Sequence, residues 1–232
     1  MLVEKRFDTG EVVLNYAEGP PNGSPLLLLH GFGETWQGFI PLLPTLTQRY
    51  QLYAVDLRGH GKSGRTPGKY HLKDYQKDIT TFIKNEINQP TFIYGHSLGG
   101  MVALLVAAES TDQIRGLIIG DAPLDAVFNR RANKASFEPN MGVRNWFMHV
   151  KIVADSGDSV LDSYYKHKDE SHHFEELEQD PVFDLFNLAT WSSLDPETCT
   201  PWVEAAGNVE AFIEHYEGYD LEMISRITCP LL

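Results

Sequence analysis

The chain has 232 residues, 42% of them apolar and 22% charged, and its 32 acidic residues against 19 lysines and arginines give a formal net charge of −13. These proportions are typical of a soluble globular protein, and they exclude the disordered, collagen-like and coiled-coil classes. An acidic chain without a cluster of lysines and arginines lacks the charge pattern of a nucleic-acid-binding protein. No apolar run reaches the ~18–20 residues that span a bilayer, and the first residues lack the apolar segment of a secretory signal. A cytoplasmic protein without a nucleic-acid or membrane partner is therefore expected.

Short apolar segments alternate with helical patterns along the first 121 residues. Two strands are predicted at residues 2–7 and 11–16, around a turn at Thr9–Gly10. Continuous apolar runs, which are typical of strands buried on both faces, follow at residues 25–29, 50–55, 91–94 and 117–120. Apolar positions at helical spacing predict an amphipathic helix over 72–87, and the apolar stretch 98–108 predicts a buried helix. This alternation predicts an α/β fold with a mostly parallel sheet and helices on both faces.

Residues 122–222 differ in composition from the rest of the chain. They hold 20 acidic and 7 basic residues, three of the four tryptophans and seven of the twelve phenylalanines, whereas acidic and basic residues balance elsewhere. A solvated helical face explains most such charge patterns. An acidic surface also disfavours anionic substrates and anionic lipids. We therefore predict an acidic, aromatic-rich segment at 122–222, set between a core at 1–121 and a return to the core at 223–232.

The segment Gly95–Gly99 has the pattern G-x-S-x-G between a predicted strand and a predicted helix. Glycines at 95 and 99 permit a turn tight enough to expose the hydroxyl of Ser97 at the helix N-terminus, where that hydroxyl acts as a nucleophile. The backbone N–H of Leu98 is then one natural donor for an oxyanion. His96 is adjacent to the serine on the turn, and a packing role is favoured for it over a role as base. The alternative for the whole motif is an ordinary glycine-rich turn.

A second polar loop, residues 30–33, follows the most apolar predicted strand. Oxyanion stabilisation needs a second N–H from a neighbouring loop, and Phe32 is placed to supply it. His30 and Gly31 are interpreted as support for this loop. For Gly33 an ordinary turn is the preferred interpretation. Ligands of open α/β sheets bind beyond the carboxyl ends of the strands, which is where both loops are expected.

Residues 25–33, 56–63 and 95–100, in this order and spacing, resemble the α/β-hydrolase superfamily, and most closely its serine esterases and related small-molecule hydrolases. The resemblance implies an α/β-hydrolase core over residues 1–121, a helical cap at 122–222, no metal and no organic cofactor. It also implies that Arg58 and His60 stabilise their loop. Serine at position 97 points away from the haloalkane dehalogenases and epoxide hydrolases, which use aspartate there.

Other motifs are set aside. Gly61–Ser63 is similar to the end of a phosphate-binding loop, but the required earlier glycine is replaced by Asp56. The two cysteines, Cys199 and Cys229, form neither a disulfide framework nor a zinc-ligand spacing. A solvated acidic segment is favoured over a metal site for a further group of residues without the H-E-x-x-H arrangement: His167, His172, His173, Glu175 and Glu176.

The family's triad runs in the order serine, acid, histidine. Asp121, after the sixth predicted strand, is the candidate acid, with Asp125 as a neighbouring alternative. The interpretation that Asp121 begins the cap or caps a helix is favoured over this catalytic role. No histidine stands where the catalytic one belongs, so His149 or His215 would have to reach down from the cap. Residues 227–232 are typical of the start of a seventh strand. The expectation is a C-terminally incomplete copy of a longer hydrolase, with the histidine beyond the chain end.

Together these features predict a serine hydrolase of small carboxylic esters or related acyl substrates. The substrate is expected to be neutral and apolar, in a pocket closed by aromatic residues of the cap: Trp146, Phe147, Trp191, Trp202 and Phe212. One alternative is a non-catalytic protein of the same fold that binds a small molecule. Another is a cofactor-free haloperoxidase or a hydrolase of carbon–carbon bonds.

Overall fold

A six-stranded sheet with the strand order β1-β2-β4-β3-β5-β6 forms the centre of the molecule. The structure, a computed structural model, describes residues 2–124, 127–129, 137–159, 162 and 189–232. The strands are β1 (Val3–Asp8), β2 (Val13–Glu18), β3 (Ser24–Leu29), β4 (Tyr50–Val55), β5 (Thr91–His96) and β6 (Ile114–Gly120). β1 and β2, and β2 and β4, pair antiparallel, whereas β4, β3, β5 and β6 run parallel. The predicted α/β fold with a mostly parallel sheet is confirmed.

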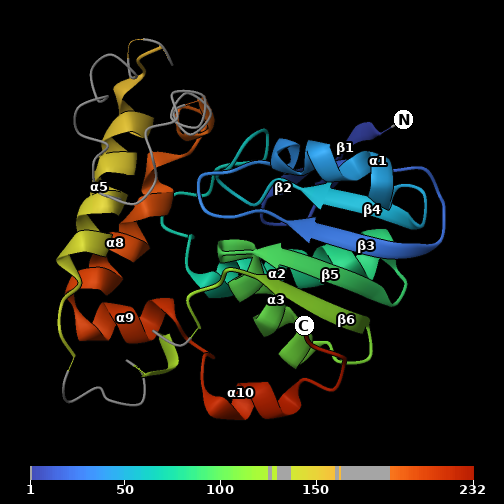
Figure 1. Cartoon of the computed structure of the whole chain (residues 1–232). Coiled ribbons are helices and arrows are strands. Elements are labelled where there is room, and N and C mark those ends of the chain that lie inside the picture. The colour runs from blue at the N-terminus through green and yellow to red at the C-terminus, as the bar shows by residue number, and fades with distance from the viewer. Residues whose placement is uncertain (1, 125–126, 130–136, 160–161, 163–188) are drawn as a thin grey trace.

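Helices cover both faces of this sheet (Figure 1). α2 (Leu72–Phe82), its π-helical continuation η2 (Ile83–Ile87), α3 (Leu98–Glu109) and α10 (Leu221–Arg226) lie on one face. The short helices η1 (Trp36–Leu42) and α1 (Leu43–Leu46) lie on the other. The predicted helices at 72–87 and 98–108 are therefore present. The pair η1 and α1 was not predicted, because prolines at 41 and 44 interrupt the helical pattern there.

β3 shows why its sequence is apolar at every position. Leu27 and Leu29 belong to the core cluster formed with α2 and α3, whereas Leu26 and Leu28 belong to the cluster formed with η1 and α1. Successive side chains of a strand point to opposite faces, so a strand covered on both faces is apolar throughout. The same burial on both sides fixes β3 at the middle of the sheet and its carboxyl end beside that of β5.

The two N-terminal strands begin later than predicted. Residues 9–12 form a turn, in which the Thr9 N–H donates to the Val12 carbonyl at 2.9 Å and the Val12 N–H donates to Oγ1 of Thr9 at 3.1 Å. Gly10 adopts a φ of +89°, which favours glycine. The threonine thus extends the turn into residues whose apolar pattern is that of a strand.

The helices of the middle segment lie across the end of the sheet toward which the parallel strands point (Figure 1). They are α5 (Met141–Ser156), the short η4 (Pro196–Cys199), α8 (Thr200–Gly207) and α9 (Val209–His215). The predicted domain boundaries at 121 and 222 stay predictions. The histidine and glutamate group at 167–176 and Asp125 lie outside the described residues.

The last residues lie beside β6. The Leu117 N–H donates to the Pro230 carbonyl and the Leu232 N–H donates to the Leu117 carbonyl, both at 2.9 Å, which places Leu231 parallel to β6. This is where the sequence predicts a seventh strand to begin. Within the described part of the chain, no helix is long and apolar enough to cross a membrane.

Asp56, directly after β4, joins three separate segments around the sheet end. Its carboxylate accepts hydrogen bonds from the Trp36 N–H at 2.8 Å, Nδ2 of Asn15 at 2.9 Å and the Lys62 N–H at 3.1 Å. Asp56 is fully buried, and burial raises its pKa against these hydrogen bonds. The carboxylate therefore holds the loop of residues 56–63 in place.

Replacing Asp56 with alanine is expected to lower the free energy of unfolding by about 3 kcal/mol, because three donors would lose their shared acceptor. Urea denaturation followed by circular dichroism measures this loss. The matched control is Asp112→Ala, since Asp112 is exposed, and a change within about 0.5 kcal/mol is expected for it. Equal effects of the two substitutions would contradict the bridging role.

Candidate active site

Ser97 occupies a strained turn between β5 and α3. Its φ of +47° and ψ of −111° lie in a region that a residue with a side chain rarely adopts. The turn is closed by two glycines: a Cβ at Gly99 would lie 2.3 Å from the Leu29 carbonyl oxygen, and one at Gly95 would lie 2.4 Å from the Gly99 oxygen. The G-x-S-x-G spacing is thus required by packing, and it leaves Ser97 half-buried at the edge of a cavity.

Backbone hydrogen bonds hold this turn, and the Leu98 N–H takes no part in those that join the described residues. The Ser97 N–H donates to the Gly120 carbonyl at 2.8 Å, and the Gly99 N–H donates to the His30 carbonyl at 3.1 Å. The Leu98 N–H, at the first position of α3, donates no hydrogen bond to any described residue. It belongs to the positive end of a twelve-residue helix, where an anion is favoured.

The neighbouring loop presents a second unused N–H. Nε2 of His30 accepts the Leu57 N–H at 3.0 Å, which assigns the ring proton to Nδ1. Nδ1 then donates to the Gly31 carbonyl at 2.7 Å, and the Glu34 N–H donates to the same carbonyl at 3.2 Å. In a trans peptide the C=O and N–H point in opposite directions, so the Phe32 N–H faces away from His30. It donates no hydrogen bond within the described residues.

Burial keeps the histidine of this loop neutral. His30 is fully buried, and desolvation lowers its pKa to about 4. At neutral pH the ring therefore has one proton, and the Leu57 N–H keeps that proton on the nitrogen facing Gly31. His60 is also buried, with a pKa lowered to about 3 chiefly by burial, and its Nδ1 lies 2.9 Å from the Arg58 carbonyl oxygen.

An ion pair of Glu34 and His96 lies beside Ser97, and the sequence analysis does not anticipate Glu34. Nδ1 of His96 lies 3.2 Å from Oε1 of Glu34, and Oε2 of Glu34 accepts the Gly31 N–H at 2.9 Å. The hydrogen bond to Glu34 raises the pKa of His96. Burial would raise the pKa of Glu34, but the hydrogen bonds from His96 and Gly31 outweigh it and lower that pKa. Glu34 follows the predicted donor Phe32 by two residues, and this proximity is the feature of the sequence that could have identified it.

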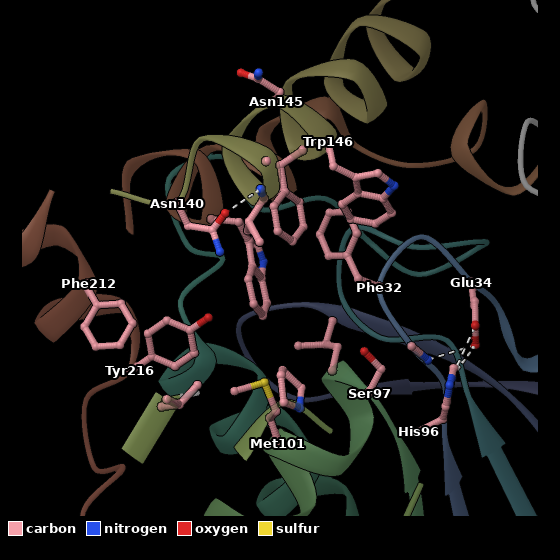
Figure 2. Close-up of a pocket in the computed structure, with 18 residues that line it drawn as sticks. Phe32, Glu34, His96, Ser97, Met101, Asn140, Asn145, Trp146, Phe212 and Tyr216 are labelled. Carbon is pink, nitrogen blue, oxygen red and sulfur yellow. Dashed lines mark hydrogen bonds and ion pairs between the residues drawn. The ribbon is translucent and has the colours of Figure 1, made fainter. Parts of the chain in front are cut away.

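A cavity of about 620 Å³ opens above Ser97, between the sheet end and the helices that cross it (Figure 2). Its aromatic lining comes from the loop of residues 30–34, from α5, α8 and α9, and from the residue that follows α9: Phe32, Trp146, Phe147, Trp202, Phe212 and Tyr216. Of the predicted lining residues, Trp191 alone is not in this wall. A Cβ at Gly33 would lie 2.8 Å from the Trp191 ring, so glycine is needed there for close packing as well as for the turn.

The predicted acid and the two cap histidines are not part of the described cavity wall. Asp121 is exposed directly after β6 with a φ of +50°, and its charge contributes to the raised pKa of His96. His215 is fully buried, with its ring centroid 4.4 Å from that of Trp202. His149 packs near Trp191, at 6.2 Å between ring centroids. Their predicted roles in the triad stay predictions.

Arg58 and Cys199 are buried and do not belong to the described cavity wall. Arg58 is fully buried and donates from Nε and Nη2 to Asp78, at 2.6 Å each. Burial raises the pKa of Cys199 to about 12. Among the residues that the structure describes, no group of three or more histidine, cysteine, aspartate or glutamate side chains is placed to hold a metal ion.

Comparison with known proteins agrees with this architecture. A family model described as the alpha/beta hydrolase fold matches residues 24–226. The chain is 33% identical over 120 residues to the 2-(acetamidomethylene)succinate hydrolase of Mesorhizobium japonicum, covering 52% of this chain and 43% of that protein. It is 33% identical over 110 residues to the esterase YbfF of Escherichia coli, covering 47% of this chain and 43% of the relative. The matches thus span less than half the length of these curated relatives.

A solved structure extends the likeness to the whole chain. An N-acyl homoserine lactonase superposes with a TM-score of 0.66 at 19% identity, and the match covers 100% of this chain and 76% of that one. At this identity the likeness shows the fold alone. The family model, however, matches most of the sequence, including β3, the loop that carries Phe32, and the turn at Ser97. The chain therefore belongs to the α/β-hydrolase fold family.

Proposed function

We propose that the protein is a serine hydrolase that cleaves small, neutral carboxylic esters or related acyl compounds through Ser97. One observation carries the proposal: a serine in a strained turn faces an apolar cavity beside the Phe32 and Leu98 N–H groups, which donate to no residue that the structure describes. Strained conformations persist where the surrounding structure enforces them, and they cluster at active sites. Figure 2 shows the Ser97 hydroxyl directed toward the cavity below Phe32.

The proposed reaction has two steps. Oγ of Ser97 attacks the carbonyl carbon and loses its proton to a base, while the carbonyl π electrons move to the oxygen. The Phe32 and Leu98 N–H groups stabilise that oxyanion, and each such donor contributes about 10²–10³ in rate. Collapse of the intermediate expels the alcohol, which takes the proton from the base. Water, activated by the same base, then hydrolyses the acyl-enzyme and regenerates Ser97.

The cavity supports a neutral substrate. Its described wall includes no lysine or arginine, and its acidic and basic side chains are Glu34 and His96, which pair with each other. The named substrate of the Mesorhizobium relative is a succinate derivative, and carboxylates are usually held by arginine or lysine. The net charge of −13 further disfavours an anion. We therefore propose substrates without carboxylate groups.

The base is proposed to be a histidine beyond residue 232, with the orienting acid either there or at Asp121. No histidine except His96 lies in the described cavity wall, and Nδ1 of His96 faces Glu34. Figure 2 shows the His96 ring turned toward Glu34 and away from the Ser97 hydroxyl. Without such a base a serine is a weak nucleophile.

A fluorophosphonate probe tests the function, because labelling requires an activated serine. We expect the probe to label the peptide that contains Ser97 in the protein at its natural length, and to label residues 1–232 alone only weakly. For the same natural-length protein, kcat/KM is expected to be at least about tenfold higher for p-nitrophenyl butyrate than for mono-p-nitrophenyl succinate. The reason is that burying an unpaired carboxylate is costly. Absent labelling together with tight binding of a neutral ester would instead favour the non-catalytic alternative.

A further inference from the structure

Glu34 connects the loop that carries Phe32 to the turn that carries Ser97. Its carboxylate accepts the Gly31 N–H at 2.9 Å, while its own N–H donates to the Gly31 carbonyl at 3.2 Å. Oε1 of the same carboxylate lies 3.2 Å from Nδ1 of His96. Gly31 is thus held on both of its peptide groups by one residue, and that residue is paired with the neighbour of the nucleophile.

The loop and the imidazole are in close contact. A Cβ at Gly31 would lie 2.8 Å from Nδ1 of His96 and 3.2 Å from Oε1 of Glu34, so a larger residue there would displace one of these side chains. The side chains of His96 and Glu34 are 34% and 32% exposed. Partial burial of this kind screens an ion pair less than a fully exposed position does.

We propose that Glu34 and His96 are positioning residues whose ion pair holds the Phe32 N–H in place beside Ser97. The inference rests on the proposed function and assigns these two side chains a task within it. His96 touches neither the reacting atoms nor the Ser97 hydroxyl in this arrangement. It acts through the Glu34 carboxylate on the Gly31 N–H, which lies one peptide before the Phe32 N–H.

The ion pair of Glu34 and His96 should stabilise the transition state more than the bound ester. An oxyanion exists only after attack, so a displaced Phe32 N–H weakens a contact that the bound ester does not yet make fully. Misplacement of a group by about 1 Å can cost about 10²-fold in rate. Loss of the pair should therefore lower kcat and leave KM nearly unchanged.

Kinetics of matched variants test this assignment in the natural-length protein. Glu34→Ala and His96→Phe are expected to lower kcat by about 10–100-fold with KM within about twofold. Affinity for a trifluoromethyl ketone, which mimics the oxyanion, should fall by the same factor as kcat/KM, while affinity for the carboxylic acid product stays constant. His96→Gln retains an N–H donor and should recover most of kcat.

A second histidine–glutamate pair supplies the control. Nε2 of His71 and Oε1 of Glu214 are 4.0 Å apart, and neither residue belongs to the described cavity wall. Glu214→Ala removes a carboxylate beside a histidine without touching the loop of residues 30–34. It is expected to leave kcat and the trifluoromethyl ketone affinity unchanged.

The pH dependence gives an independent readout. The groups that face His96 are Glu34, His30 and Asp121. Glu34 raises the pKa of His96, so the ion pair is complete below that pKa and loses its charge as pH rises through it. In an NMR titration, the Phe32 amide resonance should move together with the His96 ring, and Glu34→Ala should lower the pKa of His96 and abolish that movement.

The outcomes separate the two proposals. If the wild-type protein hydrolyses esters but Glu34→Ala and His96→Phe leave kcat and the ketone affinity unchanged, the positioning role is wrong and the proposed function stands. If the wild-type protein hydrolyses nothing, the proposed function fails. The NMR titration then still tests whether His96 is coupled to Phe32. A Phe32 amide resonance that does not move as His96 titrates would overturn the positioning role.

Discussion

Replacing Ser97 with alanine is expected to lower kcat for ester hydrolysis by about 10⁶-fold, since removal of the nucleophile of a serine triad has that effect in other hydrolases. The residual rate should stay about 10³–10⁴-fold above that of water, because the Phe32 and Leu98 N–H groups remain. The ester should still bind, since the cavity wall is unchanged. Stopped-flow and steady-state assays on the natural-length protein, with Ser97→Ala compared to wild type, measure the loss.

Ser225→Ala is the matched control, because Ser225 is exposed and its hydroxyl donates only to the Glu222 carbonyl in its own helix. Ser97→Gly adds a stability test. Glycine accepts the φ of +47° without strain. The free energy of unfolding of Ser97→Gly should therefore exceed that of Ser97→Ala by about 1 kcal/mol or more. Retained esterase activity in Ser97→Ala would show that another residue is the nucleophile.

Replacing His30 with alanine is expected to lower kcat by about 10²–10³-fold, comparable to removal of one oxyanion donor. The reason is geometric: Nδ1 of His30 holds the Gly31 carbonyl at 2.7 Å and so directs the Phe32 N–H the opposite way. Without the imidazole the peptide can rotate. The measurement is kcat, together with the affinity for a trifluoromethyl ketone, which should fall in parallel.

His60→Ala controls for loss of a buried ring. His60 is as buried as His30, and the two ring centroids are 5.0 Å apart, but its Nδ1 lies against the Arg58 carbonyl and not against Gly31. Both substitutions should lower the free energy of unfolding, by about 2–4 kcal/mol for the lost packing and hydrogen bonds. Only His30→Ala should lower kcat strongly. Equal losses of kcat would mean that the effect comes from general loosening of the sheet end.

Much of the fold could be predicted from the sequence because it depends on local chemistry. The apolar run of β3 indicates a strand covered on both faces, and the helical spacing over 72–87 indicates an amphipathic helix. Prediction failed where short-range hydrogen bonds compete with the apolar pattern, as at Thr9, or where prolines conceal a helix, as in η1 and α1. At Thr9 a local hydrogen bond outweighs the strand preference of the apolar residues, and in η1 and α1 the prolines mask the helical pattern of their neighbours.

The candidate site divides in the same way. Gly95, Ser97 and Gly99 are recognisable in the sequence because the turn needs those residue types at fixed spacing. The reason is that a Cβ at Gly99 or Gly95 would lie only 2.3 or 2.4 Å from a backbone oxygen. His30 is visible as part of a motif, but its task depends on the Leu57 N–H, which lies in another loop. Asp121 is exposed directly after β6 and does not belong to the described cavity wall, and this position depends on how the sheet packs.

By itself, the sequence determined the strands, the buried helix α3 and the turn that presents Ser97, because these depend on residues close together in the chain. Only the tertiary structure decided that Glu34 meets His96, 62 positions away. The parallel pairing of β3 with β5, with Leu29 opposite Gly95, brings the two loops to the same edge of the sheet. Which side chains then touch depends on strand register and packing, and neither is encoded in the residues around Glu34.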